Sequence, residues 1–393
     1  MLHPSDIVIV AARRTPIGAF QGMFTPVSAP QLAATAIRTA LADSKIDDGS
    51  INEVILGCVL QAGQGQAPAR QAMLNAGLPT DIPATTINKV CGSAMKAMML
   101  ACDQLKAGSA TAIIAGGFES MTNAPYLLPK ARGGYRMGHG EILDHMFFDG
   151  LQNPYDKQMM GYFADATAAK YSFSREQQDA FASESVRRAQ AALGNGAFAA
   201  EITPVTVKTR KGEQVIAQDE TPGNCDLSKI SSLKPAFNKD GTVTAASSSS
   251  IADGAAALIF TTAAYAQAHG LQPLARVVAY AGHAQQPEWF TTAPTGAMQK
   301  TLAKAGWQVS DVDLFEINEA FACVTMAAMH DLQLPHDKVN IHGGACALGH
   351  PIGAAGARIT TTLIHALHAR GGGRGMASLC IGGGEAVAMA IEI

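Results

Sequence analysis

The chain has 393 residues, of which 48% are apolar and 16% charged, and its formal net charge is −3. High hydrophobicity with few charges excludes an intrinsically disordered chain. The 29 basic residues do not outnumber the 32 acidic ones, so the chain lacks the positive charge expected of a nucleic-acid-binding protein. Its apolar runs have the length of buried strands, well short of the roughly 18 residues of a membrane span. We expect a globular protein of two to three domains that binds neither nucleic acid nor membrane.

The seven cysteines argue against a disulfide framework or a structural zinc site, because their number is odd and no two form a Cys-x-x-Cys pair. The N-terminus also lacks the layout of a signal peptide, since its apolar stretch at 7–10 is too short and is followed by Arg13 and Arg14. We therefore expect reduced thiols and a cytoplasmic protein.

Apolar, β-branched runs alternate with longer helical patterns at the start of the chain, which is typical of an α/β fold with buried strands. The pattern predicts strands at 6–11, 53–59, 84–87 and 111–115, and helices at 30–42, 67–76 and 91–107. The middle of the chain, 121–251, breaks this alternation and contains a helix whose capping box is formed by Ser174 and Gln177. We interpret it as an insertion that forms a lid or a substrate-binding segment, after which the last strand of the first half follows at 255–261.

The last part of the chain repeats the order of the first. It predicts strands at 275–281, 313–318, 339–341, 376–381 and 386–391, and helices at 295–305, 320–332 and 351–369. In each half the third helix begins beside a chemically special residue, Cys91 in the first and His350 in the second. This pattern indicates an internal repeat of about 120 residues. We therefore divide the chain into a first half (1–120 plus 252–271), an inserted domain (121–251) and a second half (272–393), with a site between the halves.

Cys91 is a candidate nucleophile in the segment 88–93 (Asn-Lys-Val-Cys-Gly-Ser). Only the thiolate is a good nucleophile, and the N–H groups and dipole of a helix N-terminus favour that anion. Gly92 lets a substrate approach the backbone closely. The alternative is a small buried apolar residue, which is the commoner fate of a cysteine.

His350 lies in a glycine-rich stretch, 343–353, and precedes a proline that suits the first position of a helix, so we expect His350 to be the helix cap. A histidine can take a proton from a thiol. Cys380 ends a predicted strand, where ligands bind in open α/β sheets, and a second thiol there can act as acid or base. Asn318 also lies at a strand end, where its amide can orient a water or hold an oxyanion.

Other kinds of site are not supported. The glycines at 63–65 resemble a dinucleotide fingerprint, but Pro68 stands where its third glycine belongs. The chain has no Walker A, His-Glu-x-x-His or Gly-x-Ser-x-Gly stretch, and its histidines lack metal-ligand spacing. We expect no metal and no redox cofactor.

Together the segments around these residues resemble the signatures of the thiolase family. The matching stretches are 14–18, 88–93, 116–121, 318–322, 343–353 and 380–384, in the family's order and at its spacing. The resemblance covers essentially the whole chain. It implies an α/β fold of two βαβαβαββ halves, layered α/β/α/β/α, with an inserted loop domain.

Within the family the likeness is to the short-chain acetyl-CoA acetyltransferases, which condense two acetyl-CoA molecules to acetoacetyl-CoA and CoA, or run the reverse thiolysis. The resemblance implies that Cys91 becomes acetylated with His350 as its base, and that Cys380 exchanges a proton with the second substrate. It implies one oxyanion hole made by His350 and a water on Asn318, and another made by the backbone N–H groups of Cys91 and Gly382. Coenzyme A thioesters are then substrates rather than cofactors.

The resemblance also implies a substrate pocket and an assembly. The acyl pocket falls on Leu151, Met160 and Phe290, and the remaining substrate or CoA contacts on Ser249, Ala320 and Phe321, with Met159 where many relatives have a histidine. Cations for the CoA phosphates are available at Lys208, Arg210, Lys211, Lys229 and Lys234. The family likeness predicts a homotetramer, a dimer of dimers, with part of 121–150 as the contact loop.

Three alternatives stay open. The first is a degradative 3-ketoacyl-CoA thiolase of broader chain length. The second is a non-catalytic acyl-CoA-binding relative, which we would expect to lack one of Cys91, His350 and Cys380. The third, a decarboxylating ketoacyl synthase, is disfavoured because those enzymes pair a cysteine with two histidines, or with a histidine and an asparagine, instead of with a second thiol.

Overall fold

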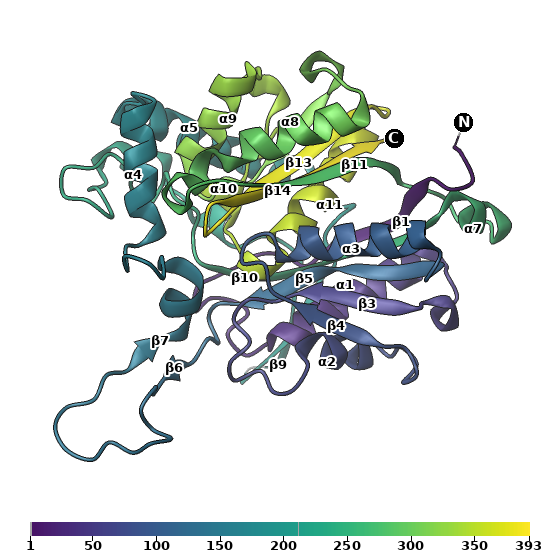
Figure 1. Ribbon diagram of the computed structural model, residues 1–393, viewed down its shortest axis with the longest axis horizontal. Coiled ribbons are helices and arrows are strands. Elements are labelled where there is room, and N and C mark those ends of the chain that lie inside the picture. The colour runs from purple at the N-terminus through teal and green to yellow at the C-terminus, as the bar shows by residue number, and fades with distance from the viewer. Residues whose placement is uncertain (1, 211) are drawn as a thin grey trace.

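A computed structural model describes residues 2–210 and 212–393 of the protein, so the candidate phosphate ligand Lys211 lies outside the described residues. In this part of the chain ten strands form one mixed sheet, in the order β12-β13-β14-β11-β1-β10-β5-β3-β4 with β2 beside β10. Its two ends come from the two halves of the sequence (Figure 1).

The first half contains each strand and helix that its alternating pattern predicts, together with β2 and α7, which the pattern did not predict. The strands are β1 (Ile7–Arg14), β2 (Gly18–Ala19), β3 (Glu53–Gly57), β4 (Ala84–Ile87), β5 (Ala112–Ser120) and β10 (Ala252–Thr262), and the helices are α1 (Ala29–Ser44), α2 (Pro68–Asn75), α3 (Ser93–Ala107) and α7 (Ala263–Ala268). β5 continues five residues beyond its predicted end through Gly116 and Gly117. A Cβ at Gly116 would lie 2.1 Å from the Ala256 carbonyl oxygen, so these glycines permit close strand packing instead of ending the strand.

The second half repeats this order. Its strands are β11 (Ala275–Ala284), β12 (Leu314–Ile317), β13 (Arg374–Ile381) and β14 (Glu385–Glu392), and its helices are α8 (Ala293–Ala305), α9 (Ala322–Leu332), α10 (Ala345–Leu348) and α11 (Ala355–Ala369). In the series β1-β10-β5-β3 the first two strand pairs are antiparallel and the third is parallel. The series β11-β14-β13-β12 in the second half has the same order of directions. The halves join where β1 pairs with β11 over three residues.

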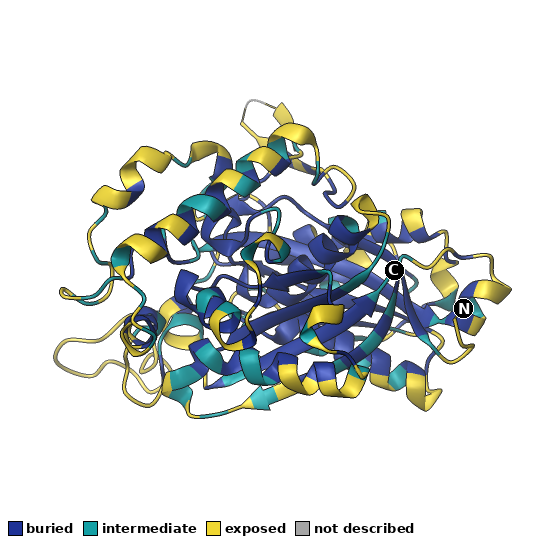
Figure 2. Ribbon diagram, turned by 90° about the horizontal axis from the view of Figure 1, so that it is seen from above, coloured by how far each residue is buried: buried dark blue, intermediate teal, exposed yellow. Residues whose placement is uncertain are grey.

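The helices make this sheet part of a five-layered molecule. One core cluster contains α3 and α11 packed between the two halves of the sheet. A second contains α1 and α2 against the outer face of the first half, and a third contains α8 and part of α9 against the second half. Figure 1 shows α8 on one side, α3 and α11 in the middle and α1 and α2 on the other side, and Figure 2 shows the buried interior between them. The predicted α/β fold with duplicated halves is confirmed.

The segment between β5 and β10 carries the irregular elements. These are β6 (Tyr126–Leu127), β7 (Leu143–Asp144), the π-helical turn η2 (Phe147–Leu151), α4 (Met160–Lys170), α5 (Arg175–Asn195), β8 (Val205–Thr209), β9 (Gly212–Ile216), α6 (Thr221–Asn224) and η3 (Leu227–Ser232). The capping box predicted at the start of α5 is present, with Ser174 N donating to Gln177 Oε1 at 2.8 Å. A long loop between β6 and β7 extends away from the body (Figure 1).

Two local predictions in the second half are wrong. Residues 339–341 do not form a strand: Val339 makes only an isolated bridge to Phe315. Asn340 has a left-handed backbone (φ 48°), so the chain turns away from the strand direction. Its side chain accepts a hydrogen bond from Ile317 N at Oδ1 and donates one from Nδ2 to Ile317 O, each at 2.8 Å. Likewise the helix predicted at 320–332 begins only at Ala322, because the backbone of Phe321 is extended (φ −143°, ψ 152°) and Ala320 O accepts a hydrogen bond from Ser249 N.

His350 is not the cap of an α-helix, which corrects a third prediction. The turn after it is the 3₁₀ helix η7 (Ile352–Ala354), and α11 starts only at Ala355. The backbone of His350 instead pairs with the strand-like segment before β10, donating from its N–H to Ser250 O at 3.0 Å. Cys91 similarly lies two residues before α3, because Val90 has a left-handed backbone (φ 48°).

No helix in residues 2–210 and 212–393 is both long and apolar enough to cross a membrane.

Candidate active site

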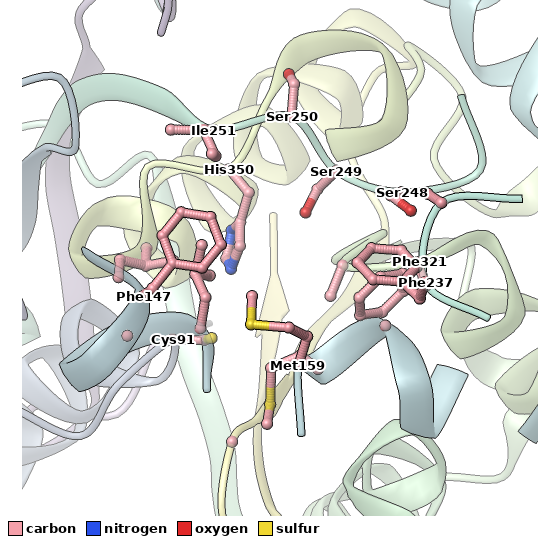
Figure 3. Close-up of a pocket in the computed structure, with 18 of the residues that line it drawn as sticks. Cys91, Phe147, Met159, Phe237, Ser248, Ser249, Ser250, Ile251, Phe321 and His350 are labelled. Carbon is pink, nitrogen blue, oxygen red and sulfur yellow. The ribbon is translucent and has the colours of Figure 1, made fainter. Parts of the chain in front are cut away.

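Loops from both halves and from the inserted segment meet at one cavity of about 350 Å³. Four of the predicted catalytic residues line it. Cys91 comes from the loop between β4 and α3, His350 from the turn before η7, Cys380 from the end of β13, and Gly382 from the turn after it. Figure 3 shows the His350 imidazole pointing into the cavity beside Cys91.

The Cys91 thiol is partly buried, and this burial raises its pKa to about 11. The backbone N–H groups of Gly382 and of Cys91 itself oppose the rise, and the negative charge of Glu119 adds to it. The thiol is therefore protonated at neutral pH and needs a base before it can attack. The N–H groups that face it come from both halves of the molecule.

His350 is the base available to this thiol. Burial, followed by the charge of Arg358, lowers its pKa to about 3, so the imidazole is neutral at pH 7. Its Nδ1 lies 3.4 Å from Asn318 Nδ2, whereas Nε2 has no hydrogen-bond partner among the described residues. A neutral imidazole held through one nitrogen leaves the other able to accept a proton.

Cys380 is fully buried yet lines the cavity. Burial, then the negative charges of Cys91 and Cys323, raise its pKa well above the usual range of a thiol. At neutral pH Cys380 is a proton donor, and its thiolate, once formed, is a strong base.

Asn318 does not line the cavity directly but lies behind His350, at the end of β12. Its backbone N–H donates to Ser378 O at 2.9 Å, which fixes it to β13. Its side-chain Oδ1 is buried and has no partner in the part of the chain that the structure describes. Asn318 can therefore orient His350 and still accept one more hydrogen bond.

All six predicted substrate-binding residues line the same cavity. They are Leu151 at the end of η2, Met160 at the start of α4, Phe290 in η4 (Pro287–Thr292), Ala320 and Phe321 after β12, and Ser249 before β10. Aromatic pairs stiffen this wall. The rings of Phe290 and Phe163 pack edge to face with their centroids 6.4 Å apart, and the rings of Phe321 and Phe237 do so at 5.8 Å. The structure thus brings the predicted site residues together, and their individual roles stay predictions.

Sequence reasoning missed several lining residues. Phe147, Phe237, Met121, Ile251 and Ile352 also line the cavity, and so does Met159, which the family resemblance had already placed near the pocket. Figure 3 shows Phe147 beside Cys91 and His350, and Phe237 with Phe321 at the other end. Most lie in irregular segments, where no periodic pattern marks an apolar residue as part of a site. Of the basic residues proposed for the CoA phosphates, Lys208, Arg210, Lys229 and Lys234 are described and do not line this cavity.

An ion pair joins the loop that carries Cys91 to the start of β14. Lys89, two residues before Cys91, pairs with Glu385 at the start of β14. A Cβ at Gly92 would lie 2.3 Å from Ile381 Cδ1, so the nucleophile loop and the end of β13 approach as closely as a glycine permits. No group of three or more potential metal ligands occurs within residues 2–210 and 212–393.

Comparison with known proteins places this site in a family. The models for "Thiolase, N-terminal domain" and "Thiolase, C-terminal domain" match residues 7–264 and 271–393. The chain belongs to the thiolase family. This thiolase is therefore an acyltransferase, as the signature segments predicted.

Curated relatives of this thiolase match it over nearly its full length. The acetyl-CoA acetyltransferase of Escherichia coli K12 is 50% identical over 389 residues, covering 98% of this chain and 99% of the relative. The acetyl-CoA acetyltransferase of Pseudomonas aeruginosa is 47% identical over 388 residues, with the same coverage.

Solved structures agree with the fold. The acetyl-CoA acetyltransferase of Bacillus anthracis superposes with a TM-score of 0.96 at 41% identity, covering 98% of both chains. The Acat5 thiolase of Ascaris suum, solved in complex with coenzyme A, superposes with a TM-score of 0.94 at 40% identity, covering 98% of this chain and 99% of that one.

Proposed function

We propose that the protein is an acetyl-CoA C-acetyltransferase that interconverts two acetyl-CoA molecules with acetoacetyl-CoA and CoA. The observation that carries the proposal is the convergence of Cys91, His350 and Cys380 on one cavity, in a chain about half identical to proteins named acetyl-CoA acetyltransferase. An acyl-CoA-binding protein without catalysis has no need for two thiols and a neutral histidine at one place.

The first half-reaction acetylates Cys91. His350 takes the proton from the Cys91 sulfur, and the thiolate attacks the thioester carbonyl of acetyl-CoA. The N–H groups of Cys91 and Gly382 stabilise the oxyanion of the tetrahedral intermediate, a contribution of roughly 3–4 kcal/mol per donor. The carbon–sulfur bond to CoA then breaks, and Cys380 gives its proton to the departing sulfur, so that CoA leaves as the thiol and Cys380 becomes a thiolate.

The second half-reaction joins the two acetyl groups. The thiolate of Cys380 removes a proton from the α-carbon of a second acetyl-CoA, and the enolate oxygen is stabilised by His350 and by a water on Asn318. The α-carbon attacks the acetyl-Cys91 carbonyl, the carbon–sulfur bond to Cys91 breaks to give acetoacetyl-CoA, and His350 returns to the Cys91 sulfur the proton that it took in the first half-reaction. In thiolysis Cys380 instead takes the proton of the incoming CoA thiol, and all steps run in reverse.

The acyl end of the cavity supports a short-chain substrate. Leu151, Met160 and Phe290 supply bulky side chains where the acyl group would extend. Each additional methylene changes the free energy of binding by only about 1–3 kcal/mol, so the walls favour C4 without excluding longer chains absolutely. Rates of thiolysis across C4 to C16 substrates separate this proposal from a broader 3-ketoacyl-CoA thiolase.

The deciding experiment is the mass of the intact protein after mixing with acetyl-CoA, followed by peptide mapping. We expect one added acetyl group on Cys91 that free CoA removes. The matched control is Cys91→Ala, which should remain folded by circular dichroism and take up no acetyl group. A folded wild-type protein that binds CoA but forms no adduct at Cys91 would show that the proposal is wrong.

We also propose a cytoplasmic homotetramer. The β6–β7 hairpin exposes large apolar side chains, with Tyr126 in β6 68% exposed and Met137 in the connecting loop 97% exposed, and an exposed apolar patch marks an interaction surface. The seven cysteines are all free, which suits a reducing compartment. Light scattering on the purified protein measures its mass, and deletion of the loop should reduce that mass to the dimer.

A further inference from the structure

Glu119 is a buried carboxylate near the site to which the proposed mechanism gives no part. It is the penultimate residue of β5, and its side chain is fully buried. Its carboxylate accepts three backbone hydrogen bonds, from Val59 N at 3.0 Å, Leu60 N at 3.1 Å and Gly353 N at 3.0 Å. Two of these donors follow β3 in the first half, and the third lies in η7, three residues after His350. One side chain therefore fastens the His350-bearing turn of the second half to the first half.

The loops that Glu119 holds form part of the cavity wall. Val59, Leu60 and Ile352 belong to a single apolar cluster, against which Cys91 and Leu151 pack. A Cβ at Gly353 would lie 2.7 Å from Glu119 Oε2, so only glycine lets this turn approach the carboxylate so closely. A shift of the carboxylate would thus move the wall that supports both Cys91 and the turn after His350.

The charge of Glu119 also acts on the nucleophile. It raises the pKa of Cys91, and burial raises the pKa of Glu119 itself to about 7 against the opposing effect of its N–H donors. The titratable groups that face it are Cys91 and Cys58, whose sulfur lies 3.6 Å from Oε1. The neighbouring elements β10 and η7 present the glycines Gly254 and Gly353 to it.

We propose that Glu119 is a positioning residue of this active site, whose carboxylate holds the turn after His350 against the loop that supports Cys91. The inference rests on the proposed function for its kinetic consequences. Glu119 touches neither the reacting thiol nor the substrate cavity surface, so it acts through the backbone groups that it binds.

Two substitutions separate the shape of Glu119 from its charge. Glu119→Gln keeps the length but replaces one acceptor oxygen with a donor and removes the charge, and we expect kcat to fall 10- to 100-fold with KM changed less than threefold. Because a like charge is removed, the pH midpoint of Cys91 alkylation by iodoacetamide should move to lower pH. Glu119→Asp keeps the charge but falls one methylene short, so kcat should fall while the alkylation midpoint stays near that of the wild type.

Glu316→Gln is the matched control. Glu316 is also a buried carboxylate with a raised pKa, but it pairs with Arg358 at 3.5 Å, and no hydrogen bond among the described residues links its side chain to η7 or to the segment after β3. This variant also removes a buried carboxylate, but it should leave the alkylation midpoint of Cys91 near that of the wild type. A folded Glu119→Gln protein with wild-type kcat and the wild-type midpoint would overturn the proposal.

A measurement on the wild-type enzyme keeps the test decisive if the Gln variant does not fold. Protonation of Glu119 adds a donor where three donors already converge, so kcat should fall as the pH drops through about 7, a range in which His350 stays neutral. A flat kcat between pH 5.5 and 8 would overturn the proposal. Failure of the proposed function shows separately, as the absence of acetyl-Cys91 in the wild type, and leaves the alkylation test intact.

Discussion

The amide nitrogen of Asn318 lies 3.4 Å from Nδ1 of His350, although the two residues reach this contact from different elements. Asn318 follows β12, and His350 follows the short helix α10. The contact fixes the rotation of the imidazole and leaves its second nitrogen for the cavity. Asn318 is thereby placed to influence catalysis through His350.

We expect Asn318→Ala to lower kcat for thiolysis of acetoacetyl-CoA by about 10- to 100-fold, because the imidazole loses its orientation and one oxyanion hole loses its water. His350→Ala should cost more, about 10²- to 10⁴-fold, because the base itself is removed. Steady-state kinetics at saturating substrate measure both. An Asn318→Ala enzyme with the wild-type kcat would contradict the role given to this contact.

The neutral state of His350 also predicts how stability depends on pH. Its pKa is about 3 when folded and about 6.5 when unfolded, so the unfolded chain binds a proton that the folded chain does not. The stability that the neutral imidazole contributes is fully present above pH 6.5 and is lost as the pH falls toward 3. Between pH 7.5 and 5 this linkage amounts to about 2 kcal/mol.

Urea unfolding of the wild type and of His350→Gln at the two pH values isolates this effect. The wild type should lose about 2 kcal/mol more than the variant on going from pH 7.5 to 5. Buried carboxylates such as Glu119 and Glu316 contribute the opposite pH dependence, but equally in both proteins, so they cancel in the difference. Equal losses in both proteins would show that His350 is not buried in its neutral form.

The alternation of strands and helices could be predicted from the sequence because buried strands and amphipathic helices have different apolar periods. A shared site for Cys91, His350 and Cys380 could also be predicted, because the duplicated halves place equivalent loops at the same edge of the sheet. The prediction failed where one side chain overrides the local pattern. Residues 339–341 have the composition of a strand, but the clasp between Asn340 and Ile317 turns the chain.

The finer shape of the site lay beyond the sequence for a related reason. Glu119 stands in a strand pattern, and nothing local marks it as the acceptor of N–H groups from residues 59 and 353. Phe147 and Phe237 lie in segments without periodicity, so their position on the cavity depends on how the inserted segment folds back. Long-range backbone contacts of this kind leave no signal in one sequence.

Phe290 should set the upper limit on acyl chain length. It is buried at the acyl end of the cavity, and Phe290→Ala opens space for further methylenes. We expect the ratio of kcat/KM for 3-ketohexanoyl-CoA over acetoacetyl-CoA to rise about 10- to 100-fold.

Phe163→Ala is the matched control, because Phe163 packs edge-on against Phe290 but does not line the cavity. It should cost stability and change the ratio much less; an equal change in both variants would mean that general loosening, rather than pocket volume, governs chain length.

The close approach of Gly92 to Ile381 should be necessary for catalysis, because Ile381 precedes Gly382, whose N–H we propose as an oxyanion donor. A methyl group at Gly92 would lie 2.3 Å from Ile381 Cδ1 and 2.9 Å from Cγ1, which forces the two loops apart. A displacement approaching 1 Å costs about 10²-fold in rate, so Gly92→Ala should lower kcat by at least about 10-fold.

Ile381→Ala removes both clashing atoms, and adding it to Gly92→Ala should restore part of the lost kcat, although Ile381→Ala alone costs about 2–5 kcal/mol of stability. The double-mutant cycle measures the coupling in kcat, which we expect at about 0.5–3 kcal/mol. Additive effects of the two substitutions would show that Gly92 matters for a reason other than this contact.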